Sequence, residues 1–123
     1  MNKPVILLVE DGQIYILSTK DYCDKDFEIL IATNLAEADV LFSANKDRLF
    51  AVVMDGCLGH QRPNTVELTR YIRRQAPGLP IVAYSSDPRI NALLRTAGCQ
   101  HEIEKDPLEL QRLLLKLVED SKK

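Results

Sequence analysis

The sequence predicts an α/β fold in which a parallel β-sheet is covered by helices on both faces. Short apolar runs alternate five times with segments that have helical spacing, and the connections between them are short. The clearest runs are apolar at every position, as in strands buried on both faces of a parallel sheet. Because crossovers between parallel strands are right-handed, only a few topologies fit this pattern.

Five segments are expected to form the strands. The strongest candidate ends at Asp55 and Gly56, where an apolar run of strand-forming residues stops abruptly. The weakest is the last, a short segment with Ile103 as its best apolar residue. The expected strands are residues 5–9, 27–32, 49–55, 79–84 and 101–104.

Helical segments fill the intervals between these strands. Residues 13–23 form the first, although its apolar spacing is untidy, and residues 66–76 form the third. Gly98 ends the fourth helix, and the fifth has a clean leucine stripe. Capping residues mark the other starts. These are Asn34 with Glu37, Asn64 with Glu67, Asp87 before Pro88, and Asp106 before Pro107 with Glu109.

Length and charge restrict the class of protein. The 123 residues suffice for one domain with a real core and not for two, so residues 1–123 are expected to form a single domain. A net charge of −2 without a basic tract argues against nucleic-acid binding by this domain. No apolar segment approaches the ~20 residues of a membrane span. The apolar run at 5–9 is also too short for a signal peptide.

The cysteines and histidines show no metal-type spacing. The cysteines are odd in number, and they are Cys23, Cys57 and Cys99. This favours free thiols in a reducing compartment, so a cytoplasmic location is expected. His60 and His101 are expected to be surface residues.

Polar residues follow four of the expected strands. The carboxyl ends of parallel strands meet at one edge of a sheet, where ligands bind in folds of this class. That edge should therefore collect three carboxylates, a hydroxyl and an ammonium. The residues are Glu10, Asp11, Asp55, Ser85 and Lys105. A turn or a helix entry would explain one of these residues alone, but not the whole set.

Clustered carboxylates need a proton or a cation. At ~4 Å and an effective dielectric constant of ~20, two ionised carboxylates repel each other by roughly 4 kcal/mol. Carboxylate oxygens suit Mg²⁺, which accepts one or two of them together with phosphate oxygens. A carboxylate beside Mg²⁺ can attack phosphorus and become an aspartyl phosphate. A lysine and a hydroxyl would then bind the phosphoryl oxygens.

The chain resembles the receiver domain of bacterial two-component response regulators. Four motifs carry the resemblance, in the family's order and at about its spacing, and they cover nearly the whole chain. They are ILLVED at 6–11, VVMD at 52–55, PIVAYS at 80–85 and EK at 104–105. The resemblance implies a flavodoxin-like three-layer α/β/α sandwich with five helices. Its five-stranded parallel sheet would have the strand order 2-1-3-4-5.

The resemblance also implies a role for each site residue. Asp55 would accept a phosphoryl group from a sensor histidine kinase or a phosphotransfer protein. Glu10, Asp11 and Asp55 would hold Mg²⁺ together with the backbone carbonyl of Cys57. Ser85 and Lys105 would bind the phosphoryl group. The domain would catalyse only its own phosphorylation and dephosphorylation, and would signal to a downstream protein or an attached output domain.

Three features depart from the family pattern. Asp106 follows Lys105 where the family usually has proline, so no cis peptide is expected there. Glu102 occupies the position of the switch aromatic, which excludes the usual serine–aromatic coupling. The loop at 57–63 is also longer than usual.

The missing aromatic and the displaced Pro107 favour a second interpretation, a docking or dimerisation module that works without phosphorylation. Leu108 and Leu115, seven residues apart on the last helix, could form a contact with a partner or with a second copy in a homodimer. A Mg²⁺-dependent phosphohydrolase would need a second acid shortly after Asp55, which the sequence lacks. A flavin carrier would need a hydroxyl- and glycine-rich phosphate loop after the first strand, where this chain has acids.

Overall fold

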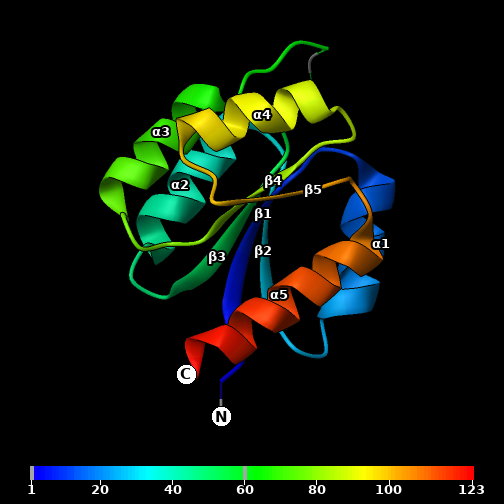
Figure 1. Cartoon of the computed structure of the whole chain (residues 1–123), viewed down its shortest axis with the longest axis vertical. Coiled ribbons are helices and arrows are strands. Elements are labelled where there is room, and N and C mark those ends of the chain that lie inside the picture. The colour runs from blue at the N-terminus through cyan, green and yellow to red at the C-terminus, as the bar shows by residue number, and fades with distance from the viewer. Residues whose placement is uncertain (1, 60) are drawn as a thin grey trace.

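Strands and helices alternate five times along the chain (Figure 1). The computed structural model describes residues 2–59 and 61–123, so the predicted surface position of His60 lies outside the described residues. The elements are β1 (Val5–Val9), α1 (Gln13–Cys23), β2 (Glu28–Ala32), α2 (Leu35–Asn45), β3 (Leu49–Met54), α3 (Val66–Gln75), β4 (Ile81–Tyr84), α4 (Pro88–Ala97), β5 (His101–Ile103) and α5 (Pro107–Ser121).

The strands form one parallel sheet in the order β2-β1-β3-β4-β5, as predicted. The central strands β1, β3 and β4 are the apolar runs of the sequence, and their residues are almost all buried. The edge strands β2 and β5 are more exposed, which explains why β5 has the weakest sequence signal. His101 at the start of β5 is half-buried rather than on the surface.

Two apolar cores lie on opposite faces of the sheet. Alternate residues of β1 point to different cores: Leu7 lies with Phe42 and Ile72 of α2 and α3, and Leu8 lies with Leu114 of α5. The first core is covered by α2, α3 and α4, and the second by α1 and α5 (Figure 1). This is the predicted three-layer α/β/α sandwich. No helix among the described residues has the length and apolar character needed to cross a membrane.

Most of the predicted helix caps form. Asn34 Oδ1 accepts a hydrogen bond from the amide of Glu37 at 2.9 Å. The carboxylate of Glu37 reaches back to the amide of Thr33 at 2.7 Å, one residue before the position that a capping box uses. Asp87 caps α4 and Asp106 caps α5, each followed by a proline in the first turn.

The capping box predicted at Asn64 and Glu67 is wrong. The N-cap of α3 is Thr65, which makes no side-chain capping bond. Asn64 instead turns into the preceding loop, where its amide group exchanges two hydrogen bonds of 2.8 Å with the backbone of Leu58. Leu58 is itself buried in the core beneath α3 and α4, so Asn64 stabilises the long loop rather than the helix.

Candidate functional site

Glu10 and Asp55 follow the paired last residues of two neighbouring strands, β1 and β3. Val9 of β1 pairs with Met54 of β3, so Glu10 and Asp55 follow side by side. The amide of Glu10 donates to the carbonyl of Ala32 at 2.9 Å, and the amide of Asp55 donates to that of Val9 at 3.0 Å. Sheet pairing therefore fixes the backbone from which both carboxylates project.

The predicted site residues line one cavity of about 260 Å³ at the carboxyl edge of the sheet, and they are Glu10, Asp11, Asp55, Cys57, Ser85 and Lys105. One carboxylate oxygen from each of Glu10, Asp11 and Asp55 lies within 4.8 Å of the other two. Glu10 is fully buried and Asp55 is 5% exposed. The structure thus brings the whole predicted set together.

Lys105 reaches into this group from the β5–α5 connection. Its Nζ lies 2.8 Å from Oε1 of Glu10 and 3.5 Å from Oδ2 of Asp55. The lysine side chain is 12% exposed, so the ion pairs are largely shielded from water. The group contains one ammonium and the carboxylates of Glu10, Asp11 and Asp55. The net charge of these four side chains is −2 when all are ionised.

Burial and the excess of negative charge both raise the pKa of Asp55. Burial and the neighbouring Glu10 raise the pKa of Asp55 from 3.8 to about 7, and Lys105 opposes this only in part. Burial opposes the charge on Lys105, but its contacts with Glu10 and Asp55 outweigh that effect and raise the pKa of the ammonium. The site therefore holds Lys105 charged and is short of positive charge around Asp55.

Backbone amides orient the outer carboxylate oxygens. The amide of Gly12 donates to Oε2 of Glu10 at 2.9 Å, and the amide of Gly59 donates to Oδ2 of Asp11 at 2.7 Å. Gly59 has a φ of +66°, a conformation that favours glycine. The long loop after β3 therefore holds Asp11 in place across the mouth of the site.

The donor set fits a hard divalent cation. The oxygens of the three carboxylates are close enough to share one ion, and a charge of +2 would balance the net charge of the group. The charge of a cation would also oppose the effects of burial and of Glu10, which raise the pKa of Asp55. Cys57 lines the same cavity, and its amide lies 3.4 Å from Oδ1 of Asp55. Its proposed role as a carbonyl ligand stays a prediction.

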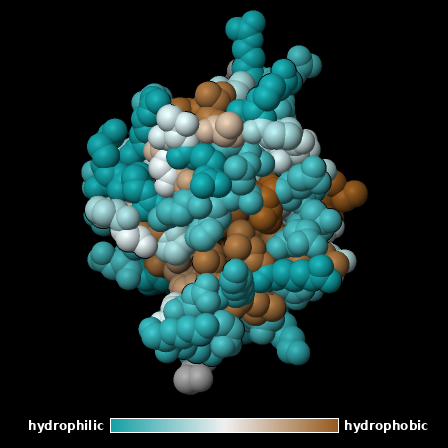
Figure 2. All heavy atoms as spheres, in the orientation of Figure 1, coloured by the Kyte–Doolittle hydropathy of each residue, from teal (hydrophilic) through white to brown (hydrophobic). Residues whose placement is uncertain are grey.

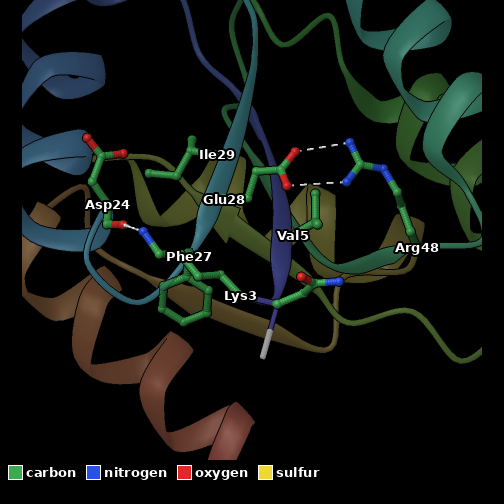
Figure 3. Close-up of a pocket in the computed structure, with 8 residues that line it drawn as sticks. Lys3, Val5, Asp24, Phe27, Glu28, Ile29 and Arg48 are labelled. Atoms are coloured by element: carbon green, nitrogen blue, oxygen red, sulfur yellow. Dashed lines mark hydrogen bonds and ion pairs between the residues drawn. The ribbon is translucent and has the colours of Figure 1, made fainter.

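A larger hollow of about 770 Å³ lies at the opposite, amino-terminal end of the sheet (Figure 3). Its charged side chains bond to neighbours within the chain. Nζ of Lys3 donates to the carbonyl of Asp24 at 2.6 Å, and Arg48 binds both carboxylate oxygens of Glu28. Among the described residues, no group of converging carboxylates lines this hollow, so its chemistry differs from that of the acidic site.

Comparisons with solved structures find the same architecture in signalling proteins. A response regulator from Thermotoga maritima has a TM-score of 0.78 at 23% identity, and the match covers 95% of this chain and 98% of that one. A two-component response regulator from Clostridium difficile has a TM-score of 0.83 at 17% identity, with 98% and 100% covered. This is the response-regulator receiver fold.

The similarity lies in structure more than in sequence. A signal receiver domain of an HD domain-containing protein from Pseudomonas fluorescens Pf-5 also has this fold, with a TM-score of 0.81 at 20% identity over 98% of this chain and 90% of its own. No family model matches the sequence, and no curated protein matches it. The resemblance seen in the motifs is thus confirmed for the receiver fold.

Ser85 stands at the end of β4 in this receiver fold, and α4 holds its backbone. The side chain of Asn91 accepts from the amide of Ser85 and donates to its carbonyl, both at 3.0 Å. The same amide group lies 3.2 Å from the carbonyl of Ile103 at the end of β5. The hydroxyl of Ser85 accepts from the amide of Asp87 at 3.1 Å. Asn91 therefore ties α4 to the ends of two strands.

Two departures from the receiver pattern are visible in the structure. Glu102, in the place of the switch aromatic, forms an ion pair with Arg95 of α4 at 3.2 Å. Asp106 follows Lys105 where the family usually has proline, and the peptide bonds of the described residues are all trans. Leu108 is half-buried and Leu115 is 37% exposed, so the predicted leucine ridge of α5 is only partly exposed.

Sequence reasoning missed several residues that shape the site. Tyr15 lines the cavity, and the Nζ of Lys105 lies 4.5 Å from the centroid of its ring. Its position in the first turn of the predicted helix at 13–23, four residues after Asp11, was the available signal. Asn91 is 3% exposed and stands three residues before the buried Leu94, so it was a polar residue on the inward face of α4. The Gly59 amide gave no signal because loop paths do not follow from periodicity.

Proposed function

We propose that this chain is a phosphoacceptor receiver domain of a two-component signalling system. The observation that carries the proposal is the position of Lys105, whose Nζ lies between Glu10 and Asp55 inside a cavity that Asp11 and Ser85 also line. These residue types are what an aspartyl phosphate site needs. The fold of the solved response regulators supports the proposal independently.

In this proposal, Asp55 is the nucleophile. A carboxylate oxygen of Asp55 attacks the phosphorus of a phosphohistidine on a sensor kinase or phosphotransfer protein, and the phosphorus–nitrogen bond breaks as the histidine leaves. Glu10, Asp11 and Asp55, with the carbonyl of Cys57, would hold Mg²⁺. The ion would neutralise charge on the phosphoryl oxygens. Its charge would also favour the ionised, nucleophilic form of Asp55 at neutral pH.

Lys105 and Ser85 act on the phosphoryl group. The ammonium of Lys105 already lies 3.5 Å from Oδ2 of Asp55, so it is placed to bind an oxygen of a group attached there. The hydroxyl of Ser85 donates to another oxygen after it gives up its bond from the amide of Asp87. The chain chemically changes only itself, and it is not an enzyme that turns over a separate substrate.

The surface that would change on phosphorylation, and that a partner would bind, includes α4, β5 and α5. These elements follow Ser85 and Lys105 directly in the chain, and apolar side chains gather between α4 and α5 in Figure 2. A face of this kind suits a downstream protein, an attached output domain or a second copy of the chain. We place the domain in the bacterial cytoplasm, where sensor kinases present their phosphohistidine.

Intact-mass spectrometry tests the proposal. Wild-type protein treated with acetyl phosphate and Mg²⁺ should gain one phosphoryl group, since acetate can leave in place of histidine. Asp55→Asn should gain none, and wild-type protein in EDTA should gain none. A modified Asp55→Asn variant, or an unmodified wild type at saturating acetyl phosphate, would reject the phosphoacceptor function.

The alternative is a receiver-like docking or dimerisation module that does not use phosphate. The Arg95–Glu102 ion pair favours it, because it joins α4 to β5 where the usual aromatic switch would move. In that case the chain should bind its partner or itself equally with and without acetyl phosphate. Sedimentation at several protein concentrations, with wild type and Asp55→Asn side by side, separates the two functions.

A further inference from the structure

The ring of Tyr15 lies against the charged group of Lys105. Nζ lies 4.5 Å from the ring centroid, within the ~6 Å range of a cation–π contact. The lysine side chain is only 12% exposed, and such contacts strengthen when the cation is largely removed from water. Tyr15 therefore adds a third attraction on Lys105, beside the carboxylates of Glu10 and Asp55.

Neighbouring residues hold the ring at this position. Tyr15 meets the fully buried Tyr84 edge to face, with centroids 6.5 Å apart and an interplanar angle of 86°. Gly12 also lies close to the ring, and an added Cβ there would stand 3.1 Å from Cδ2 of Tyr15. The absence of a side chain at Gly12 thus leaves room for the ring beside Glu10 and Lys105.

We propose that Tyr15 is a positioning residue that keeps the ammonium of Lys105 in the phosphoacceptor site. The inference rests on the proposed function and extends it to a residue of α1. Without a metal, Glu10 and Asp55 hold Lys105 by charge. A divalent cation bound by these carboxylates reduces their attraction for Lys105 and repels the ammonium directly. The ring is neutral and coordinates no metal, so its attraction for the ammonium persists.

Two variants separate the ring from the phenol hydroxyl and from simple space filling. Tyr15→Phe keeps the aromatic face, whereas Tyr15→Met has a flexible side chain and no ring. At saturating Mg²⁺, Tyr15→Met should be phosphorylated by acetyl phosphate roughly 3- to 30-fold more slowly than wild type, the range expected for a shielded cation–π contact. Tyr15→Phe should stay within about twofold of wild type. Tyr22→Met, on the 43% exposed tyrosine of the same helix, is the matched control.

Nuclear magnetic resonance gives a readout that does not depend on phosphorylation. The ε-methylene protons of Lys105 should resonate upfield in wild type and Tyr15→Phe because of the ring current, and Lys105→Arg assigns the signal. The upfield shift should be lost in Tyr15→Met, while the amide spectrum should show that this variant is still folded. If Tyr15→Met does not fold, Tyr15→Leu replaces it in both measurements.

The outcomes distinguish this inference from the proposed function. A phosphorylated wild type with an unchanged rate in Tyr15→Met would overturn the role of Tyr15 and leave the phosphoacceptor function standing. An unchanged Lys105 signal in Tyr15→Met would also overturn it. A wild type that acetyl phosphate does not modify would reject the phosphoacceptor function, and the inference with it.

Discussion

Gly56 and Ile90 lie so close together that no side chain fits at position 56. A Cβ on Gly56 would overlap with Cγ2 of Ile90, at the first turn of α4. Gly56 directly follows Asp55, so the contact sets how near α4 stands to Asp55. A larger residue would have to push α4 away from the end of β3.

Replacing Gly56 by alanine should therefore destabilise the protein. We expect Gly56→Ala to lower the free energy of unfolding by about 1–3 kcal/mol, the usual cost of overpacking. Adding Ile90→Ala should recover part of the loss, because it removes the overlapping methyl group. Urea denaturation measures the unfolding free energies of wild type, Gly56→Ala and the double variant. Gly78→Ala, where an added Cβ meets nothing within 4 Å, is the control and should change little.

The raised pKa of Asp55 predicts how stability depends on pH without metal. The pKa of Asp55 is about 7 in the folded state, against 3.8 for the ordinary group. Between these values the folded state binds more protons than the unfolded state, so its stability falls as pH rises through the window. Asp55→Asn lacks this penalty. As pH rises from 4 to 8, the unfolding free energy of Asp55→Asn should therefore increase relative to that of wild type, by at most about 4 kcal/mol.

Urea denaturation in EDTA at pH 5 and pH 8 tests this pH dependence. Asp47→Asn, on an exposed carboxylate, is the control and should follow the wild-type profile. Parallel profiles for wild type and Asp55→Asn would contradict the prediction. Mg²⁺ should raise the stability of wild type more than that of Asp55→Asn, because binding to the folded state alone stabilises it.

Removing the Asn91 side chain should loosen α4. Asn91→Ala leaves the buried amide and carbonyl of Ser85 without their present partners. The expected loss is roughly 3 kcal/mol of unfolding free energy. Arg95→Ala, on the same helix, breaks only the partly exposed pair with Glu102 and should cost less than about 1 kcal/mol. Equal losses in the two variants would show that the buried amide has no special role.

The ion pair between Asp87 and Arg89 should affect the lifetime of an aspartyl phosphate. Asp87 lines the cavity, but Arg89 holds its carboxylate with bonds of 3.2 and 3.0 Å and lowers its pKa. Arg89→Ala leaves Oδ1 bonded to the amide of residue 89 but frees Oδ2 to orient a hydrolytic water. We expect decay to accelerate roughly 2- to 10-fold, below the effect of a fully placed general base.

Asp87→Ala and the double variant provide the controls for that experiment. Both lack the carboxylate, so they should decay at the same rate, more slowly than Arg89→Ala. The loss of phosphorylated mass over time, after acetyl phosphate is removed, gives each rate. Acceleration that persists in the double variant would mean that Arg89 acts through some other contact.

The fold followed from the sequence because its central strands are buried on both faces. Runs such as 5–9 and 49–54 have no polar position, so they cannot be mistaken for surface helices. The carboxylates were found for a related reason, since residues that follow parallel strands must share an edge. Lys105 was found in the same way, although β5 before it is only three residues long.

The remaining features depend on contacts that local spacing does not encode. Asn34 and Asn64 both stand three residues before a glutamate, yet only Asn34 caps its helix. The difference is Leu58, whose backbone amide donates to Oδ1 of Asn64 and whose carbonyl accepts from its Nδ2. Tyr15 and Gly59 depend likewise on a side-chain rotamer and on a loop path, which one-dimensional patterns leave undetermined.

Under the proposed function, the bonds from Asn91 to Ser85 would limit the kind of signal that leaves the site. Both backbone groups of Ser85 are fixed, so we expect a new group on Asp55 to rotate the serine side chain rather than to displace the loop. That rotation withdraws an acceptor from the amide of Asp87 at the start of α4. A protein that reads this state would sense altered electrostatics and hydrogen-bonding capacity on a nearly unchanged surface contour.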